Sequence, residues 1–331
     1  MGMTTERLLS AKDLKVSFYT RDGENQAVRG VSFHIDAGET VGIVGESGSG
    51  KSVTAKALMG LIPPPGKVHQ GEITFDGQSL SGLSEKEWRR LRGNRIAMVF
   101  QDPMTALNPV QRIGKQMAEV ITRHRGLKPK EALAEAIEML RQVGITEPER
   151  RVRQYPHEFS GGMRQRVMIA MALSCQPELL IADEPTTALD VTIQAQILDL
   201  LKGLKERSRT AIALITHDLG VVAQVCSRVV VMYGGMVMEE GPVEEIFYRP
   251  RHPYTQGLLR SLPKRDNGFK ERLVPIEGTP PNLLDPPPGC PFMARCPHAM
   301  DKCAGLPPVT EVSPGHRSLC WLTAEEEGGK R

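Results

Sequence analysis

The sequence of 331 residues contains no long apolar run, and none of its stretches approaches the ~18 residues needed to cross a membrane. The longest apolar runs, Val167 to Leu173 and Ala211 to Ile215, have the length of core elements. Residues 1–12 carry charges and lack the apolar segment of a signal peptide, which predicts a cytoplasmic protein. Any role at a membrane is therefore expected to depend on a partner.

A large excess of charge of either sign is also missing. The formal net charge is only +3, which argues against bulk attraction to nucleic acid. The sequence has no internal repeat. Its length and its hydrophobic fraction of 40% are sufficient for one large core and a smaller unit.

Short apolar runs alternate with helical patterns along most of the chain. The expected strands are at 14–19, 27–35, 41–44, 71–75, 96–100, 179–182 and 211–216, with a closing hairpin at 227–240. Helices are expected at 51–60 and 192–208, and the segment from about 102 to 175 is predicted to be a helical insert. This alternation indicates an α/β domain with a largely parallel sheet that is covered on both faces.

The segment GESGSGKS matches the phosphate-binding pattern G-x-x-x-x-G-K-[ST] between a predicted strand and a predicted helix. Its glycines let backbone N–H groups turn toward phosphate oxygens, and the N-terminus of the helix favours an anion. Lys51 is expected to reach the β- and γ-phosphates of ATP, and the Ser52 hydroxyl is expected to bind Mg²⁺. The predicted nucleotide contacts in this segment are Gly45, Glu46, Ser47, Gly48, Ser49, Gly50, Lys51, Ser52 and Val53.

An apolar strand further along the chain ends in two carboxylates, Asp183 and Glu184. An unpaired charge at the end of a buried strand is costly, so a ligand is expected there. We predict that Asp183 faces Mg²⁺ through water and that Glu184 polarises the attacking water. The pattern alone is a weak signal, because many strands end this way by chance. It becomes strong downstream of a phosphate-binding segment.

The segment FSGGMRQR, from Phe159 to Arg166, precedes the strand that ends in Asp183. Here the sequence resembles the ABC ATPase family, whose signature is a Ser-Gly-Gly element that opens a helix ahead of the carboxylate pair. The resemblance covers roughly residues 8–250. It implies that Ser160, Gly161 and Gly162 bind the γ-phosphate of ATP held by a second subunit, which fits a hydroxyl and bare N–H groups at a helix N-terminus.

The same resemblance assigns roles to further residues. Gln101 resembles the glutamine that contacts Mg²⁺ or the water and senses transmembrane subunits. Asp190, in the segment from Thr187, resembles a loop that communicates across the dimer, and His217 resembles the histidine that contacts the γ-phosphate. Phe18, or alternatively Tyr19, would stack on adenine. The implied catalytic residues are Lys51, Gln101, Glu184 and His217, and the implied Mg²⁺ ligands are Ser52, Gln101 and Asp183.

The family fold implied by these motifs is a P-loop NTPase fold. It has a RecA-like parallel sheet core, an antiparallel β subdomain and a helical subdomain. We predict an ABC ATPase domain at 1–250, with the helical subdomain at about 102–175. A small, irregular C-terminal extension that contains cysteines is expected at 251–331.

The segments HPYTQGLL at 252–259 and GCPFMARCPHAMDKC at 289–303 resemble the extension of oligopeptide and dipeptide importer ATPases. Nickel and glutathione importers share this extension and stay as alternatives. The resemblance implies ATP-driven import of di- or oligopeptides from the cytoplasmic face of the membrane. The implied partners are a second, related but different ATPase chain, two transmembrane permease subunits and an extracytoplasmic solute-binding protein.

Two other classes of function compete with import. Non-transport ABC ATPases carry long coiled coils or two tandem ATPase units, whereas this chain has one unit and a short helical insert. A pure interaction module that binds a partner or nucleic acid is disfavoured by the near-neutral charge and the complete set of catalytic motifs.

The six cysteines fall into two groups. Cys175 and Cys226 stand among apolar residues and are expected to be buried. The other four fall within the last 42 residues. Three of them lie in a segment with 11 prolines between Pro275 and Pro314, which are too many for regular structure. In a cytosolic protein such a cluster more often binds metal than forms disulfides. The clustered residues are Cys290, Cys296, Cys303 and Cys320.

The spacing of these four cysteines matches neither common zinc ribbons nor ferredoxins. Four thiolates suit either Zn²⁺ or an iron–sulfur cluster. The family resemblance implies a [4Fe–4S] cluster with a structural role, because a Pro-rich segment has no core of its own. Zinc and free thiols remain the alternatives.

Overall fold

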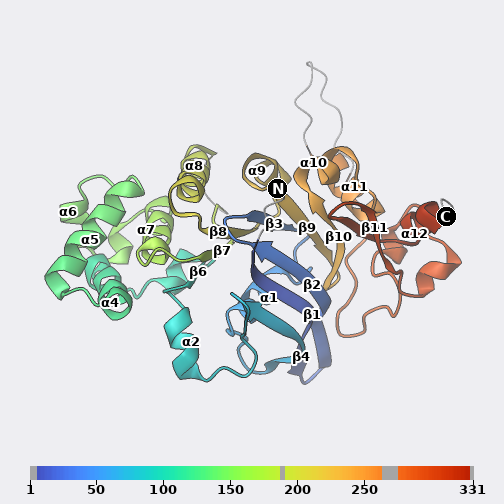
Figure 1. Cartoon of the computed structure of the whole chain (residues 1–331), viewed down its shortest axis with the longest axis horizontal. Coiled ribbons are helices and arrows are strands. Elements are labelled where there is room, and N and C mark those ends of the chain that lie inside the picture. Colours follow the sequence, from blue (N-terminus) through green and yellow to red (C-terminus); the bar gives the residue numbers. More distant parts are fainter. Residues whose placement is uncertain (1–5, 187–190, 263–274, 329–331) are drawn as a thin grey trace, which may run out of the picture. The chain divides into compact units, whose positions relative to one another are not determined.

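The computed structural model describes residues 6–186, 191–262 and 275–328 (Figure 1). These residues form two compact units, each built from segments that are distant in sequence. Of the described residues, the first unit comprises 6–8, 35–39, 82–186 and 191–215. The second unit comprises 9–34, 40–81, 216–262 and 275–328. No helix in the described part of the chain is long and apolar enough to span a membrane.

The first unit contains a parallel sheet. Strand β7 (Leu179–Asp183) lies between β6 (Ile96–Val99) and β8 (Ala211–Ile215), and both pairings are parallel. Every residue of β7 and β8 is buried, as expected for parallel strands covered on both faces. Helix α8 (Val191–Ser208) lies between β7 and β8 in the sequence and supplies the crossover that parallel strands require. The predicted strand–helix–strand alternation is confirmed.

Further helices of the first unit lie in the predicted helical insert (Figure 1). They are α3 (Pro103–Ala106), α4 (Ile113–Arg125), α5 (Pro129–Gln142), α6 (Pro148–Arg151) and α7 (Gly161–Leu173). Helices α4 and α5 pack together, burying Ile113, Met117 and Ile121 of α4. These positions recur at helical spacing, so one apolar face decides the packing.

Helix α2 (Glu85–Leu91) was not expected from the sequence. It begins at Ser84, whose hydroxyl accepts from the Glu87 N–H, while the Ser84 N–H donates to the Glu87 carboxylate at 2.7 Å. In this reciprocal capping box, the backbone N–H groups of Ser84 and Glu87 each find a side-chain acceptor at the start of the helix. The Ser-x-x-Glu pattern was the signal in the sequence that marks this helix.

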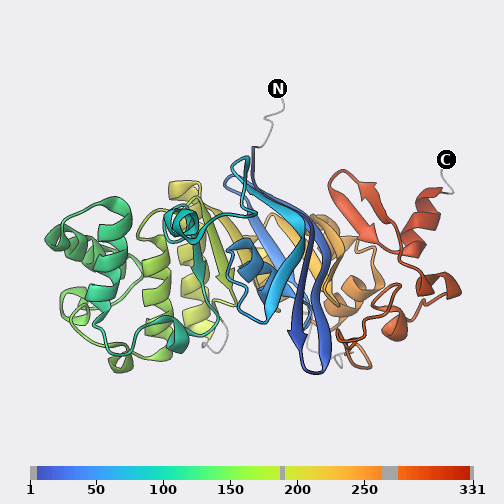
Figure 2. The ribbon, with the colours of Figure 1, turned by 90° about the horizontal axis from the view of Figure 1, so that it is seen from below.

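The second unit contains an antiparallel sheet, seen as long strands in Figure 2. Its strand order is β2-β1-β4-β5, and the antiparallel β1–β4 pairing runs from Leu9–Phe75 to Phe18–Gly66. The strands are β1 (Arg7–Thr20), β2 (Gly23–Asp36), β4 (Gly66–Phe75) and β5 (Gln78–Ser79). The predicted antiparallel β subdomain is confirmed, with β4 starting earlier than the apolar pattern indicated.

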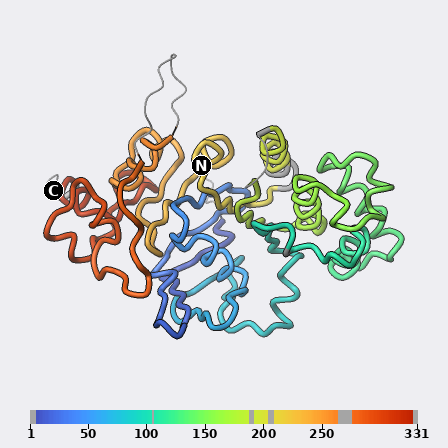
Figure 3. Tube along the Cα trace, turned by 180° about the vertical axis from the view of Figure 1, so that it is seen from behind, coloured from blue at the N-terminus to red at the C-terminus, as the bar shows by residue number. Residues whose placement is uncertain are grey.

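A second set of strands in this unit includes part of the C-terminal extension, whose trace is coloured orange to red in Figure 3. β3 (Thr40–Val44) pairs in parallel with β9 (Arg228–Tyr233), which pairs antiparallel with β10 (Met236–Pro242). Beyond β10 follow β12 (His316–Leu319) and β11 (Val309–Ser313), both antiparallel. The helices of this unit are α1 (Lys51–Leu58), α9 (Leu219–Val225), α10 (Val243–Tyr248), α11 (Pro253–Arg260) and α12 (Trp321–Gly328).

The prediction of an irregular extension is therefore wrong for residues 309–319. The prolines of this segment stand outside the paired residues: Pro307 and Pro308 precede β11, and Pro314 lies in the turn before β12. A proline outside the ladder removes no hydrogen bond from it. High proline density was thus compatible with a hairpin.

A buried carboxylate fastens the extension to β10. Glu239 has a side chain with 0% exposure and accepts hydrogen bonds from the N–H groups of Arg251 (2.7 Å) and His252 (3.0 Å). The ring Nε2 of His316 in β12 lies 2.7 Å from the same carboxylate. A buried charge is tolerated when it is paired and hydrogen-bonded in this way, so Glu239 joins three segments of the second unit.

Candidate nucleotide-binding site

The predicted phosphate loop, Gly45–Gly50, connects β3 to α1 in the second unit. Lys51, which begins α1, is buried and donates from Nζ to the carbonyl oxygens of Gly45 and Glu46, each at 2.8 Å. The Ser49 hydroxyl lies 3.3 Å from the same nitrogen. The positive charge of Lys51 is thus held inside the loop by oxygens of the loop itself.

Two glycines let the loop backbone pass close to its neighbours. Gly45 has φ +150°, and a Cβ there would lie 2.1 Å from the Met232 carbonyl oxygen. Gly50 has φ +98°, and a Cβ would lie 2.5 Å from the Ala27 carbonyl oxygen. Because only glycine combines this backbone conformation with the absence of a Cβ, these two positions explain why the pattern needs glycine.

The remaining loop residues differ in exposure. Ser47 and Gly48 are exposed, Ser49 is buried, and Ser52 and Val53 at the start of α1 are half-buried. The exposed middle of the loop, at Ser47 and Gly48, and the half-buried Ser52 leave room for a ligand to approach, which agrees with the expected site of phosphate and Mg²⁺.

Three residues of the second unit that were not predicted for the site hold Glu46. The Glu46 N–H donates to the Tyr254 hydroxyl at 2.9 Å, and its carboxylate receives Arg295, which also donates to the Tyr233 hydroxyl at 3.0 Å. Burial raises the pKa of Tyr233, so the phenol stays protonated. The sequence offered one signal, the HPYT motif that contains Tyr254. Nothing in it linked Arg295 to the loop.

His217 follows β8 and belongs to the second unit. It is exposed, and the preceding Thr216 donates its N–H to the Ile43 carbonyl oxygen of β3 at 3.2 Å. The following Asp218 caps helix α9 by accepting from the Gly220 and Val221 N–H groups. The histidine is thereby held between a strand end and a helix start, beside the strand from which the phosphate loop departs.

The predicted adenine-stacking residue, Phe18, lies near the end of β1. Phe18 is half-buried, and its ring lies against Gly66 at the start of β4. A Cβ at Gly66 would lie only 2.6 Å from the Phe18 Cε1 atom. The alternative, Tyr19, is 46% exposed. The choice between the two rings stays a prediction.

The first unit brings two predicted catalytic residues together. The Gln101 side-chain amide donates from Nε2 to the Glu184 carboxylate at 2.7 Å. Glu184 follows β7 with φ +47°, in the left-handed region that non-glycine residues rarely adopt, and its N–H donates to the Ile215 carbonyl oxygen at 2.9 Å. Such strained backbone is concentrated at functional sites, and here it fixes the direction of the glutamate side chain.

Asp183 is buried at the last position of β7, as predicted. Asp190 lies outside the described residues. The two carboxylates at the end of β7, those of Asp183 and Glu184, differ in environment. Asp183 is enclosed by the sheet, whereas Glu184 is half-buried.

The predicted signature residues open helix α7 in the first unit. Ser160 is the N-cap, and its hydroxyl accepts from the Met163 N–H at 3.3 Å. Ser160 and Gly161 are exposed, and Gly162 is half-buried. Helix α7 spans residues 161–173, so its dipole and its bare N–H groups offer an anion-binding end at an exposed surface.

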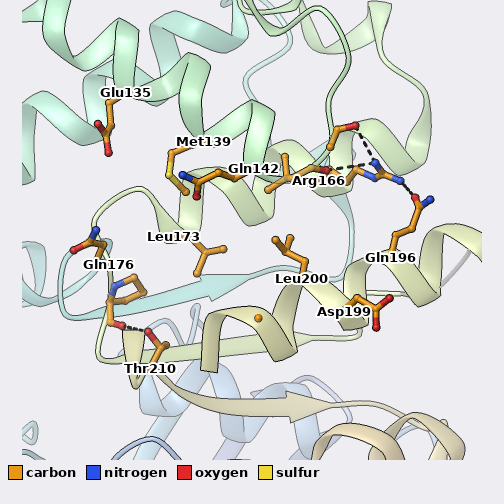
Figure 4. A pocket seen from close by; sticks show the side chains of 14 residues that line it. Glu135, Met139, Gln142, Arg166, Leu173, Gln176, Gln196, Asp199, Leu200 and Thr210 are labelled. Atoms are coloured by element: carbon orange, nitrogen blue, oxygen red, sulfur yellow. Dashed lines mark hydrogen bonds between the residues drawn. The ribbon is translucent and has the colours of Figure 1, made fainter. Parts of the chain in front are cut away.

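A cavity of about 860 Å³ in the first unit is separate from these residues (Figure 4). It is lined by α5, α7 and α8, with Met139, Leu173 and Leu200 among the apolar contacts. Arg166 crosses its edge and donates to the Gly144 carbonyl oxygen at 3.1 Å and to the Gln196 side chain. Among the described residues that line it, none is a predicted nucleotide contact.

The four clustered cysteines of the second unit converge on one small cavity of about 10 Å³. His252 and His298 line the same cavity. All six cysteines of the chain are free thiols. Cys175 is buried as predicted, whereas Cys226 is only half-buried.

The donor set of this cavity suits a thiophilic metal, but its arrangement is not a complete ligand shell. Within the described ranges, no group of three or more His, Cys, Asp or Glu side chains is placed to hold a metal ion. Burial raises the pKa of Cys290 to about 11 and also raises the pKa of Cys296 and of Cys320, so these groups are thiols rather than thiolates.

Comparison with known proteins places these features in a family. A family model described as ABC transporter matches residues 28–187, and one described as Oligopeptide/dipeptide transporter, C-terminal region, matches residues 238–303. The oligopeptide transport ATP-binding protein OppD of Bacillus subtilis is 58% identical over 318 residues, covering 96% of this chain and 89% of that protein. The dipeptide transport ATP-binding protein DppD of the same organism is 56% identical, covering 96% of this chain and 95% of that protein.

Solved structures agree with the sequence relatives. The ATP-binding cassette MJ0796, in a dimeric post-hydrolysis state bound to ADP and Pi, superposes with a TM-score of 0.65 at 30% identity, covering 71% of this chain and 99% of that chain. The predicted ABC ATPase fold is confirmed. Because relatives are 58% and 56% identical over 96% of its length, the chain belongs to the ABC transporter family of ATP-binding, ATP-hydrolysing proteins.

Proposed function

We propose that this chain powers the import of di- or oligopeptides by hydrolysing ATP. The phosphate loop carries the proposal, because Lys51 lies inside it against backbone oxygens that a nucleotide phosphate can replace. The peptide substrate is supported by two relatives whose names specify oligopeptide and dipeptide transport. The match of residues 238–303 to the C-terminal region of such transporters supports it further.

Catalysis in this proposal is positioning combined with electrostatic stabilisation. Lys51 exchanges the carbonyl oxygens of Gly45 and Glu46 for the β- and γ-phosphates. Glu184 orients the attacking water, and its carboxylate is held by the 2.7 Å hydrogen bond from Gln101. His217 offsets the charge that develops on the γ-phosphate.

Mg²⁺ would be held by Ser52, Asp183 and Gln101, where it would neutralise charge on the phosphate oxygens. Carboxylate, hydroxyl and amide oxygens are the ligands that this cation prefers. Asp183, which is buried at the last position of β7, would supply the carboxylate of this set.

A second ATPase subunit would complete each site. Ser160, Gly161 and Gly162 of one subunit would bind the γ-phosphate held by the phosphate loop of the other, and Asp190 would communicate across that interface. Phe18 would stack on adenine. We propose that the partner ATPase is a related but different chain.

The other proposed partners are two transmembrane permease subunits and an extracytoplasmic solute-binding protein. The chain would then be peripheral, on the cytoplasmic face of the membrane. The helical subdomain, about 102–175, would transmit the closure of the ATPase dimer to the permeases through the region of Gln101. We place the boundary between the ATPase domain, 1–250, and the extension, 251–331, as predicted from the sequence.

Reconstitution tests this function. The chain is co-purified with its membrane subunits and partner ATPase, placed in proteoliposomes, and supplied with ATP, the solute-binding protein and a radiolabelled pool of di- to pentapeptides. Peptide uptake that requires ATP is expected, and a complex containing Glu184→Gln should not support it. Uptake of nickel or glutathione in place of peptides would overturn the substrate, and co-purification with no polytopic membrane protein would overturn transport.

We further propose that Cys290, Cys296, Cys303 and Cys320 bind an inorganic centre, a [4Fe–4S] cluster, with zinc as the alternative. Their convergence on one cavity supports the proposal. Metal binding would require the thiols to lose their protons, and it would stabilise the Pro-rich segment that carries them. The centre would act structurally.

Anaerobic purification distinguishes the alternatives. A [4Fe–4S] cluster would give broad absorbance near 400 nm with stoichiometric iron, and zinc would give colourless protein with stoichiometric zinc. A folded, colourless preparation without either metal would contradict the proposal. For serine substitutions of the clustered cysteines, Cys226→Ser serves as the matched control, because Cys226 is remote from the cluster in sequence and does not line this cavity.

A further inference from the structure

The cysteine segment, residues 289–304, places an arginine on the phosphate loop. Arg295 lies between Cys290 and Cys303 in the sequence, and its side chain is only 5% exposed. Its Nη1 and Nη2 atoms donate to the two carboxylate oxygens of Glu46 at 2.6 and 3.0 Å. This bidentate, charge-assisted pair is the strongest common form of ion pair in proteins.

The other donors of Arg295 are also used. Nη1 donates to the Tyr233 hydroxyl at 3.0 Å, Nη2 to the Ile276 carbonyl oxygen at 3.0 Å, and Nε to the Glu277 carbonyl oxygen at 2.9 Å. All five N–H groups of the guanidinium therefore have acceptors. Hydrogen bonding to Glu46 also raises the pKa of Arg295, so the group is always charged. Its position is fixed on every side.

Glu46 connects this arginine to the lysine of the loop. The carboxylate of Glu46 accepts from Arg295, while its backbone carbonyl oxygen accepts from Lys51 Nζ at 2.8 Å. Its N–H donates to the Tyr254 hydroxyl. An uninterrupted series of hydrogen bonds thus runs from the cysteine segment to the residue that is expected to bind the β- and γ-phosphates.

The charge of Glu46 is unfavourable for a loop that binds polyphosphate. Its side chain is 25% exposed, so solvent screens it only in part. Arg295 cancels this charge and adds hydrogen bonds that hold the loop backbone. Without the arginine, a bound nucleotide would lie near an uncompensated carboxylate.

The position of Arg295 depends in turn on the folding of the cysteine segment. The Cys290 N–H donates to the Cys303 carbonyl oxygen at 2.9 Å, and the Cys296 N–H donates to the Met293 carbonyl oxygen at 3.2 Å. Phe292 packs against Tyr233 and Tyr254 with ring centroids 5.4 and 5.3 Å apart. Whatever loosens these contacts will displace the guanidinium.

We propose that Arg295 is a positioning residue of the phosphate loop, through which the order of the cysteine segment sets the affinity for nucleotide. The proposal rests on the assignment of the loop as the nucleotide site. It gives the cysteine segment a regulatory connection to ATP binding, in addition to the structural role of any centre that it holds.

The first test is a titration of the full chain with a fluorescent ATP analogue at equilibrium. Arg295→Met is expected to weaken binding about tenfold, because a charge-assisted pair is lost and a carboxylate is left uncompensated. Adding Glu46→Gln to Arg295→Met should recover most of the affinity, and Arg295→Lys should recover part of it. The loss should be larger for ATP than for ADP, because the repulsion grows with the charge of the phosphates.

Arg29→Met is the matched control. Arg29 donates to the Pro287 and Gly234 carbonyl oxygens, so it also fastens the C-terminal extension, but no hydrogen bond described for it reaches the phosphate loop. If Arg29→Met weakens nucleotide binding as much as Arg295→Met, the arginine only anchors the extension. A double variant as weak as Arg295→Met alone would also overturn the proposal. Absence of binding by the unmodified chain would refute the proposed function instead.

Hydrogen–deuterium exchange supplies a readout that does not depend on activity. Coupling between two sites is reciprocal, so saturating ATP should slow the exchange of the amides at 289–304. The effect is expected to be at least about twofold in the unmodified chain and to disappear in Arg295→Met. Exchange in this segment that ATP leaves unchanged in the unmodified chain, under conditions where it protects the phosphate loop, would contradict the coupling.

Discussion

The phosphate loop and the signature segment of this ABC ATPase use the same residue types, glycine and serine, in different surroundings. In the loop, a Cβ at Gly45 would lie 2.1 Å from a backbone oxygen, and Ser49 is buried. In the signature segment, a Cβ at Gly161 would meet no described atom within 4 Å, and Ser160 is exposed. The loop is enclosed within its own unit, whereas the signature segment is an open helix end.

This difference separates two uses of glycine. At Gly45 and Gly50 the missing side chain lets the backbone fold into a preformed cradle, so the cost of organising the loop is met when the chain folds. At Gly161 the missing side chain keeps a helix N-terminus accessible to something outside the chain. The contrast supports the proposal that each ATP is bound by the loop of one subunit and the signature segment of another.

The largest effect is expected from Glu184→Gln, which should separate ATP hydrolysis from ATP binding by the enclosed loop. Glu184→Gln should lower the rate of ATP hydrolysis by the assembled transporter about 10²–10⁴-fold, the usual contribution of a general base. ATP binding should persist, because Lys51 and the loop are unaltered, and the closed dimer should accumulate. Phosphate release and size-exclusion chromatography with ATP measure the two effects.

The exposed Glu119 of α4 provides the control for this substitution. Glu119→Gln removes the same charge without touching Gln101 or the end of β7, so hydrolysis should be unchanged. Near-normal turnover in Glu184→Gln would show that another residue orients the water.

The enclosure of the loop is tested by a pair of substitutions within it. Gly45→Ala should destabilise the protein by about 3 kcal/mol and weaken ATP binding more than tenfold, because both the strained φ and the contact with Met232 oppose a Cβ. Gly48→Ala has a positive φ of +78° but no described atom within 4 Å of its Cβ, so it should cost only about 1 kcal/mol. Urea unfolding and nucleotide titration measure both. Equal effects at the two glycines would mean that enclosure is unimportant.

The unit that encloses the loop is also expected to lose stability in acid, because His252 titrates. Burial lowers the pKa of this histidine to about 4, so the folded state favours the neutral ring, whose Nδ1 accepts from the Tyr254 N–H at 3.0 Å. With an unfolded pKa near 6.5, the unfolded chain binds the proton first as pH falls. The stability is therefore complete above about pH 6.5 and is lost as pH falls toward 4, by about 2 kcal/mol between pH 7.5 and 5.

Urea unfolding at pH 7.5 and pH 5 measures this loss. His252→Asn keeps a side-chain acceptor at the N-cap of α11 but does not titrate, so its stability should depend less on pH by about the same 2 kcal/mol. If both proteins lose equal stability between the two pH values, His252 is not the titrating group. The comparison cancels the contributions of other groups.

The sequence predicted those features that depend on local pattern. Strands β7 and β8 are buried on both faces, and this burial requires the short apolar runs from which the strands were predicted. The motifs at their ends marked Asp183 and His217 as candidate site residues. The pairing of Glu46 with Arg295 was out of reach, because a single sequence contains no signal for a contact between residues 249 positions apart. The hairpin at 309–319 was missed because proline density obscured a short paired segment.

The smallest expected effect is that of Gly161→Ala, and it tests the open side of the comparison. Because no described atom lies within 4 Å of the added Cβ, and alanine favours a helix over glycine, stability should change by less than about 1 kcal/mol, toward greater stability. The isolated chain should bind ATP with unchanged affinity. Only the assembled transporter should lose hydrolysis, since a methyl group would then stand between the helix end and the γ-phosphate of the neighbouring subunit. If the isolated chain instead loses ATP affinity, the signature segment serves its own nucleotide, and the contrast between an enclosed loop and an open helix end no longer implies two subunits.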